Sequence, residues 1–180
     1  MLAVAACGGD DGGADGEEAT DSTTPSTTSA PTTTLDEETR KEEAARAAYL
    51  AYHEAVLEAA SDPVTPDLPE LQQLTVGDQQ RIVTRNLEDL QSRGQAVRPG
   101  NESLSSHQVR SAELQQDGSI VIVDCEVDDA IVYDIQTGRV IDDDVVTRLV
   151  EARMVREAGN WRLSLSTITE EWDGANECSG

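Results

Sequence analysis

The stretch VVTRLVEARMVREAGNWRLSLSTI, residues 145–168, decides the fold of this chain. Gly159 and Asn160 are a turn signal between two runs rich in β-branched and large apolar residues. The second run places Trp161, Leu163 and Leu165 at alternate positions, which in a strand puts their side chains on one face. The stretch therefore predicts a long antiparallel hairpin with strands over residues 145–156 and 161–168.

More strands are predicted immediately upstream of this hairpin. Asp117-Gly118 and Thr137-Gly138 are tight-turn signals. They separate short apolar runs that we interpret as strands over residues 95–98, 108–115, 119–127 and 130–135. The carboxyl-terminal half of the chain is therefore predicted to form an antiparallel sheet.

The segment before the strands has helical periodicity. Residues 36–60 are predicted to form one helix, because alanine, tyrosine and valine recur at helical spacing: Ala45, Ala48, Tyr49, Tyr52, Val56 and Ala59. A proline-rich segment, residues 64–74, is predicted to be an extended connection. A second helix over residues 77–92 has a predicted buried stripe of Ile82, Val83, Asn86, Leu87 and Leu90, and Gly94 ends it. Helices followed by antiparallel strands predict an α+β domain.

The charge of the chain excludes one class of partner. Its formal net charge is -23, and residues 8–39 contain nine acidic residues and no lysine or arginine. The remaining 27 acids outnumber the 13 bases, so the predicted domain is acidic too. Such a surface repels phosphate backbones, so we predict that the protein binds no nucleic acid.

The first seven residues, Met-Leu-Ala-Val-Ala-Ala-Cys, resemble the end of a bacterial lipoprotein signal peptide. Val4-Ala5-Ala6-Cys7 fits the lipobox, in which an aliphatic residue and two small residues precede the cysteine that is acylated. Residues 8–35 follow as a Gly/Asp segment and a Ser/Thr/Pro tract, the composition of an extended tether. This order resembles actinobacterial lipoproteins. The resemblance implies a lipid anchor at Cys7, a location on the outer face of the cell membrane, and a folded domain over residues 36–180.

Cys125 and Cys178 are the two cysteines that remain. In an exported domain such a pair tends to be oxidised, so we predict a disulfide that ties the carboxyl end to the sheet. The alternative is a buried free thiol and a loose terminal one. Neither cysteine has a neighbour at zinc-ligand spacing.

The order of elements resembles the NTF2-like (cystatin-like cone) superfamily, in which helices pack in a strongly curved antiparallel sheet. The features that carry the resemblance extend over about residues 40–178. They are Tyr49 and Tyr52, the prolines from Pro63 to Pro69, Leu87-x-x-Leu90-x-x-x-Gly94, Asp124-Cys125, Gly159-Asn160-Trp161 and Cys178. The resemblance implies a pocket between the first helix and the sheet, for which we name Tyr49, Tyr52 and Trp161 as lining residues. It also implies a homodimer through the sheet face.

For the other candidate site residues, a functional role and a purely structural or solvated role are both open. His53 could face the pocket, but it follows Tyr52 directly, and neighbouring helical positions point about 100° apart; the alternative is a solvated side chain. His107 stands among polar residues and is predicted to be exposed. An acidic series offers oxygen ligands for Ca²⁺ or is simply a solvated surface: Asp124, Glu126, Asp128, Asp129, Asp134, Asp142, Asp143 and Asp144.

The sequence thus predicts a membrane-anchored binding or interaction module of the cell envelope, with a small apolar ligand or another envelope protein as partner. We assign no catalytic residue, metal ligand or cofactor from the sequence. The alternative is an enzyme of isomerase or dehydratase type that uses an acid or base in the pocket. An enclosed cavity that holds an ionisable group with a strongly shifted pKa favours the enzyme, and a filled or purely apolar interior favours the module.

Overall fold

The computed structural model describes residues 36–100, 104–176 and 178. The lipobox with Cys7 and the tether over residues 8–35 lie outside the described residues. Three helices come first: α1 (Glu37–Ala60), α2 (Pro69–Leu74) and α3 (Gly77–Ser92). Seven strands follow: β1 (Gln95–Arg98), β2 (Ser106–Leu114), β3 (Ile120–Asp128), β4 (Ile131–Asp134), β5 (Val140–Asp142), β6 (Val146–Glu157) and β7 (Asn160–Asp173). Helices before antiparallel strands confirm the predicted α+β class.

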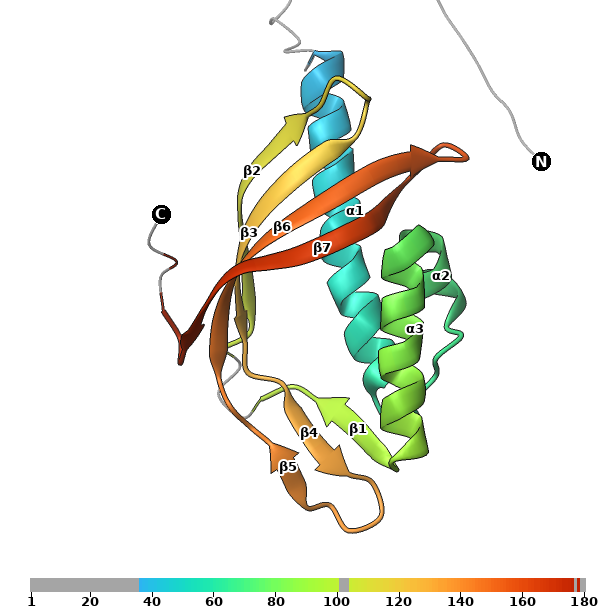
Figure 1. Cartoon of the computed structure of the whole chain (residues 1–180), viewed down its shortest axis with the longest axis vertical. Helices are drawn as coiled ribbons and strands as arrows, with labels where there is room; N and C mark the ends of the chain where they lie inside the picture. The colour runs from blue at the N-terminus through green and yellow to red at the C-terminus, as the bar shows by residue number, and fades with distance from the viewer. Residues whose placement is uncertain (1–35, 101–103, 177, 179–180) are drawn as a thin grey trace, which may run out of the picture. The chain divides into compact units, whose positions relative to one another are not determined.

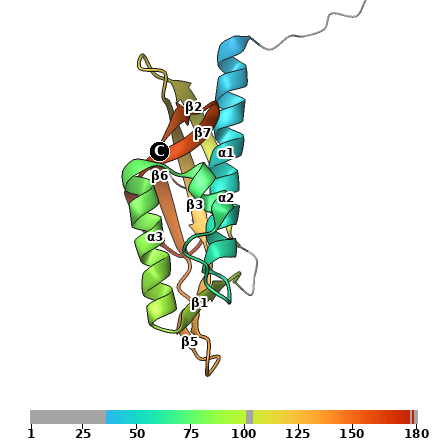
Figure 2. The ribbon, with the colours of Figure 1, turned by 90° about the vertical axis from the view of Figure 1, so that its right-hand side faces the viewer.

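The strands form two antiparallel sheets (Figure 1). A four-stranded sheet has the order β2-β3-β6-β7, and a three-stranded sheet has the order β1-β4-β5. Neither sheet is closed. Figure 2 shows α1 and α3 side by side in front of the larger sheet, so one face of that sheet is covered by helices.

The core lies between that face and α1. Side chains at alternate positions of the strands fill it, including Ile120, Ile122, Ala152, Met154 and Leu163. The α1 surface that meets them consists of small residues and two tyrosines, namely Ala45, Tyr49, Tyr52, Ala55 and Ala59. Because alanine side chains are short, the helix can lie close to the sheet. The two tyrosine hydroxyls reach polar side chains of other elements.

Local chemistry explains where the helices begin and end. The side chain of Asp36 accepts a hydrogen bond of 2.8 Å from the Thr39 amide, which caps α1. Gly94 follows α3 with φ +66°, a conformation that costs a residue with a Cβ about 1–2 kcal/mol. It reverses the chain from α3 into β1.

Several details of the fold differ from the sequence-based prediction. Residues 69–74 form α2 rather than an extended connection, because Pro69 stands at the first turn of a helix, where its missing N–H costs nothing. Leu165 is exposed, because the pairing of β6 with β7 shifts between Met154 and Arg153 and reverses the alternation after Leu163. Ile82 and Asn86, both predicted to be buried, are also exposed at the mouth of the cavity described below.

The predicted disulfide is present. Cys125 and Cys178 are joined, with their Cα atoms 5.8 Å apart. Cys125 lies between the inward-facing positions of β3, so the bridge is on the sheet face opposite α1. The segment after β7 is held there by further bonds, since the Thr147 hydroxyl donates to the Gly174 carbonyl at 2.7 Å and accepts from the Asn176 amide at 2.9 Å. The last described residues are therefore fixed to the outer face of the sheet.

Among the described residues, no helix combines the length and the apolar composition of a membrane span.

Candidate functional site: a cavity with a polar floor

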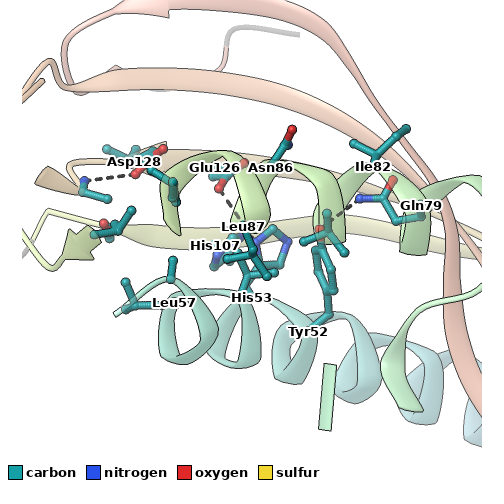
Figure 3. Close-up of a pocket in the computed structure, with 18 residues that line it drawn as sticks. Tyr52, His53, Leu57, Gln79, Ile82, Asn86, Leu87, His107, Glu126 and Asp128 are labelled. Atoms are coloured by element: carbon teal, nitrogen blue, oxygen red, sulfur yellow. Dashed lines mark hydrogen bonds and ion pairs between the residues drawn. The ribbon is translucent and has the colours of Figure 1, made fainter. Parts of the chain in front are cut away.

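A cavity of about 340 Å³ lies between α1, α3 and the ends of β1, β2 and β3 (Figure 3). Its walls are largely apolar: Val56, Leu57 and Ala60 from α1, Val83, Leu87 and Leu90 from α3, and Val97 from β1. Ile82 and Asn86 of α3 are exposed and form part of its rim. His53, His107 and Glu126 form the polar floor, and Gln79, Ser105 and Asp128 are further polar residues of the lining. The cavity therefore has apolar walls and a polar floor.

The polar floor follows from the strand register. On β3 the residues Ile120, Ile122, Asp124 and Glu126 occupy alternate positions, so all four face the helices. His107 of β2 is directly opposite Glu126, and Val109 is opposite Asp124. The two carboxylates thus continue the inward row that the isoleucines begin, and His107 is placed beside both.

Asp124 is the centre of the hydrogen bonding beneath the floor. It has no solvent exposure. Its Oδ2 atom lies 2.7 Å from Nδ1 of His107 and accepts a bond of 3.0 Å from the Tyr49 hydroxyl. Its Oδ1 atom is buried and has no hydrogen-bond partner among the described residues. The carboxylate is therefore only half satisfied.

His53 packs against the other aromatic rings of the site. Its ring centroid is 4.0 Å from that of His107, and Tyr49 and Tyr52 meet it edge-on at 4.7 Å and 5.0 Å. Its Nδ1 atom is 3.8 Å from Oε1 of Glu126. Its Nε2 atom is buried and has no partner among the described residues. The ring thus lies close to several polar groups, but neither of its nitrogen atoms forms a hydrogen bond with a described residue.

The surroundings shift the protonation of the two histidines in opposite directions. Burial, with a contribution from neighbouring His107, lowers the pKa of His53 to about 3. Burial also opposes protonation of His107, yet its bond to Asp124 and the charges of nearby carboxylates raise its pKa above the ordinary value. Burial raises the pKa of Glu126. At neutral pH His53 is therefore neutral, and His107 is the imidazole that more readily carries a proton.

A second tyrosine closes one side of the cavity. The Tyr52 hydroxyl accepts a bond of 2.9 Å from the Gln79 amide, and the Oε1 of Gln79 accepts one of 3.2 Å from the Ser166 backbone N–H. Burial raises the pKa of Tyr52, so the phenol stays protonated. This chain of bonds links α1, α3 and β7 at the edge of the cavity.

The three residues named from the resemblance have three different positions. Tyr52 lines the cavity. Tyr49 is fully buried beneath the floor, where its hydroxyl donates to Asp124 and its ring packs edge-on against His53. Trp161 lies elsewhere, in a separate hollow that it shares with Ala48 and Gln73, so grouping it with the tyrosines was wrong. Gly159 turns the chain just before Trp161, which places the indole at the other end of α1.

Two predictions for the histidines are wrong, namely that His107 is exposed and that His53 and Tyr52 cannot share one pocket. His107 is half-buried and bonded to Asp124. Tyr52 and His53 both line the cavity, because it extends around α1 from the sheet to α3 and so meets adjacent positions of the helix. The sequence signal for this site was the alternation along β3. It places Asp124 and Glu126 at inward-facing positions, where a buried strand normally has apolar residues.

The acidic series does not gather into one site. Asp128 pairs with Arg148 at 3.0 Å, and Asp129 accepts from the Leu104 amide at 2.8 Å. Asp134 and Asp142 accept bonds from the turn amides of Thr137 and Asp144. Four of these carboxylates thus bond within turns or an ion pair. Glu126 and Asp128 line the cavity, and Asp124 lies beneath its floor.

The chain matches no protein-family model and no curated protein sequence. Among solved structures, its fold is similar to the crystal structure of the intermembrane space region of chloroplast protein ARC6. The TM-score is 0.58 with 13% sequence identity, over 75% of this chain and 97% of that one. At that identity the similarity concerns the fold alone.

Proposed function

We propose that this chain is a lipid-anchored extracytoplasmic protein whose domain binds a small, largely apolar ligand that has one polar end. The observation that carries the proposal is the cavity of about 340 Å³ with apolar walls and a floor of His53, His107 and Glu126. Its size falls in the range of small-molecule sites, which are mostly apolar with a few polar groups that orient the ligand.

The floor indicates what the polar end should be. His107 is the better proton donor of the two imidazoles, and Glu126 offers carboxyl oxygens beside it. A hydroxyl group, which both donates and accepts, can bond to both. The strongly acidic chain disfavours a ligand with several negative charges. A neutral, mainly hydrocarbon molecule with a hydroxyl or similar group fits best.

The NTF2-like cone is part of the same proposal. It is supported by helices that cover one face of an antiparallel sheet and by a cavity between the first helix and that sheet. The lipid anchor rests on the lipobox that ends at Cys7 and on the tether composition after it. The disulfide supports an exported location, because such bonds persist in oxidising compartments. Docking to another envelope protein and homodimer formation stay predictions.

The pocket is tested with the neutral fluorescent probe N-phenyl-1-naphthylamine, titrated into the full chain with Cys7→Ser. The test variant is Asn86→Trp, which adds bulk at the exposed rim of the cavity without changing the core. The matched control is Glu88→Trp, on the same helix, exposed and outside the cavity lining. We expect saturable binding that Asn86→Trp weakens at least tenfold and Glu88→Trp leaves unchanged. Equal binding by all three proteins, or no saturable binding, would refute the proposal.

The anchor is tested by mass spectrometry of the mature protein from its native host, beside a Cys7→Ser variant. An added acyl mass on the native protein that the variant lacks supports the anchor. A native protein without acyl mass contradicts it and leaves the pocket proposal standing.

An acid–base enzyme is the second candidate, and one observation favours it. Asp124, fully buried, holds Nδ1 of His107, an arrangement that orients an imidazole for proton transfer. The strongly lowered pKa of His53 agrees with this candidate, because such shifts are common at functional sites. Compounds extracted from the native protein would be incubated with wild type and with His107→Gln. Conversion by the wild type alone identifies an enzyme, and binding without conversion identifies a module.

A further inference from the structure

Two buried polar atoms without partners lie in the same cluster. They are Nε2 of His53 and Oδ1 of Asp124, two of the three such side-chain atoms in the described part of the chain. A buried acceptor without a partner costs about 1–3 kcal/mol. Both atoms can act as acceptors, so a cation between them would satisfy both at once.

His107 completes a set of three ligands. One ligand atom each from His53, His107 and Asp124 lies within 4.8 Å of the others. The three residues come from α1, β2 and β3, so the folded core holds them and no single loop does. We propose that this cluster binds one divalent transition-metal ion, with Zn²⁺ as the best fit.

The donor set decides the kind of metal. Two imidazole nitrogens and one carboxylate suit zinc and its neighbours, whereas Ca²⁺ requires six to eight oxygen ligands. In a tetrahedral site with bonds near 2.0–2.1 Å, ligand atoms are about 3.3 Å apart. A pair at the 4.8 Å limit must therefore approach by about 1.5 Å, which rotation of the two half-buried imidazoles can supply.

The surroundings suit a metal that is open on one side. Tyr49 donates to Oδ2 of Asp124 and so fixes the carboxylate while Oδ1 stays free. Such outer hydrogen bonds orient metal ligands. His53, His107 and Glu126 line the cavity, so a fourth coordination position would face it. Three protein ligands with one open position are the pattern of metal sites that bind a water molecule or a ligand.

The chain offers a clean test because it contains only two histidines. The full chain with Cys7→Ser, freed of metal with chelator and of any affinity tag, is titrated with ZnCl₂ by calorimetry. The test variants are His53→Gln and His107→Gln. His53 donates no hydrogen bond to a described residue, so His53→Gln leaves the hydrogen-bond network intact even if His107→Gln unfolds the site. The control is the triple variant Asp142→Asn, Asp143→Asn and Asp144→Asn, which removes exposed carboxylates far along the chain from the cluster.

We expect one equivalent of Zn²⁺ to bind to the wild type and to the triple variant. His53→Gln should weaken it by more than the 10- to 100-fold that loss of an outer partner costs. Co²⁺ should give the visible absorption of a four-coordinate site in the wild type and lose it in His53→Gln. Equal Zn²⁺ binding by wild type and His53→Gln, or no stoichiometric binding by the wild type, would overturn the proposal.

This inference goes beyond the proposed function, and the two fail separately. The probe titration is performed in chelator and needs no metal. Probe binding without Zn²⁺ binding would refute the metal site alone, and Zn²⁺ binding without probe binding would refute the pocket alone.

Discussion

Removing the disulfide should be the most destabilising change outside the core. The perturbation is the double variant Cys125→Ser and Cys178→Ser, in the Cys7→Ser background. The bridge closes a loop of 53 residues. In the chain-entropy treatment a loop of that length restricts the unfolded chain by about 4 kcal/mol at 25 °C.

Contacts around the two cysteines add a smaller amount to the free energy that the bridge contributes. Both cysteines are nearly fully buried, and the Cys178 amide donates to Sγ of Cys125 at 3.3 Å. Arg110 also donates to the Cys178 carbonyl. Without the bridge these contacts become weak, and the segment after β7 should detach from the outer face of the sheet. The cavity lies on the other face, so probe binding should persist under conditions where the variant is folded.

The assay is urea unfolding followed by the fluorescence of the chain's two tryptophans. We expect the free energy of unfolding to fall by about 4 kcal/mol, a large part of the 5–15 kcal/mol typical of a domain. Wild type treated with reductant should behave as the double variant does. A loss below about 1 kcal/mol would refute the reasoning that the bridge restricts the unfolded chain.

Three further predictions concern the site and the turn before β1. Tyr49→Phe removes the hydroxyl that donates to buried Asp124 and should lower the free energy of unfolding by about 1.5–3 kcal/mol, measured by urea unfolding; an unchanged midpoint would contradict it. The pKa of His53 is about 3 in the folded state against 6.5 ordinarily, so its burial has no pH-dependent cost above pH 6.5 and destabilises the fold increasingly as the pH falls from 6.5 towards 3. Between pH 7 and pH 5, wild type should therefore lose about 2 kcal/mol relative to His53→Gln, and parallel pH profiles of the two proteins would exclude this. Gly94→Ala places a Cβ at φ +66°, where no atom beyond the adjacent residues lies within 4 Å, so backbone strain alone should cost about 1–2 kcal/mol in urea unfolding, and an unaltered stability would argue against this.

Much of the fold could be predicted from local patterns. The hairpin around Gly159 and the helix that ends at Gly94 carry turn and capping signals that act within a few residues. One error arose where pairing between distant segments decides the outcome, and another where a local signal has two meanings. The shift between β6 and β7 that exposes Leu165 leaves no trace in the strand's own alternation, and α2 depended on a proline that is also common in extended segments.

The site was harder to predict because its parts are far apart in the chain. Tyr52 was named from the resemblance, but His107 becomes meaningful only once β2 is aligned with β3 so that it faces Glu126. Asp124 belongs to an acidic series that the sequence predicts to be Ca²⁺ ligands or a solvated surface, because its neighbours along the chain are acidic. Asp124 is two positions after Ile122 and four after Ile120, so it shares their inward face of the strand. This spacing was the one local sign that it is buried.

The two histidines allow the central claim to be tested directly. In ¹⁵N-labelled protein, the long-range ¹H–¹⁵N spectrum of the imidazole rings contains signals from two side chains only, because the chain has two histidines. On addition of N-phenyl-1-naphthylamine in chelator, both sets of ring signals should shift in a saturable manner, and Asn86→Trp should abolish the shift. Histidine signals that stay unchanged while the probe binds elsewhere on the protein would contradict the claim that this cavity is the binding site.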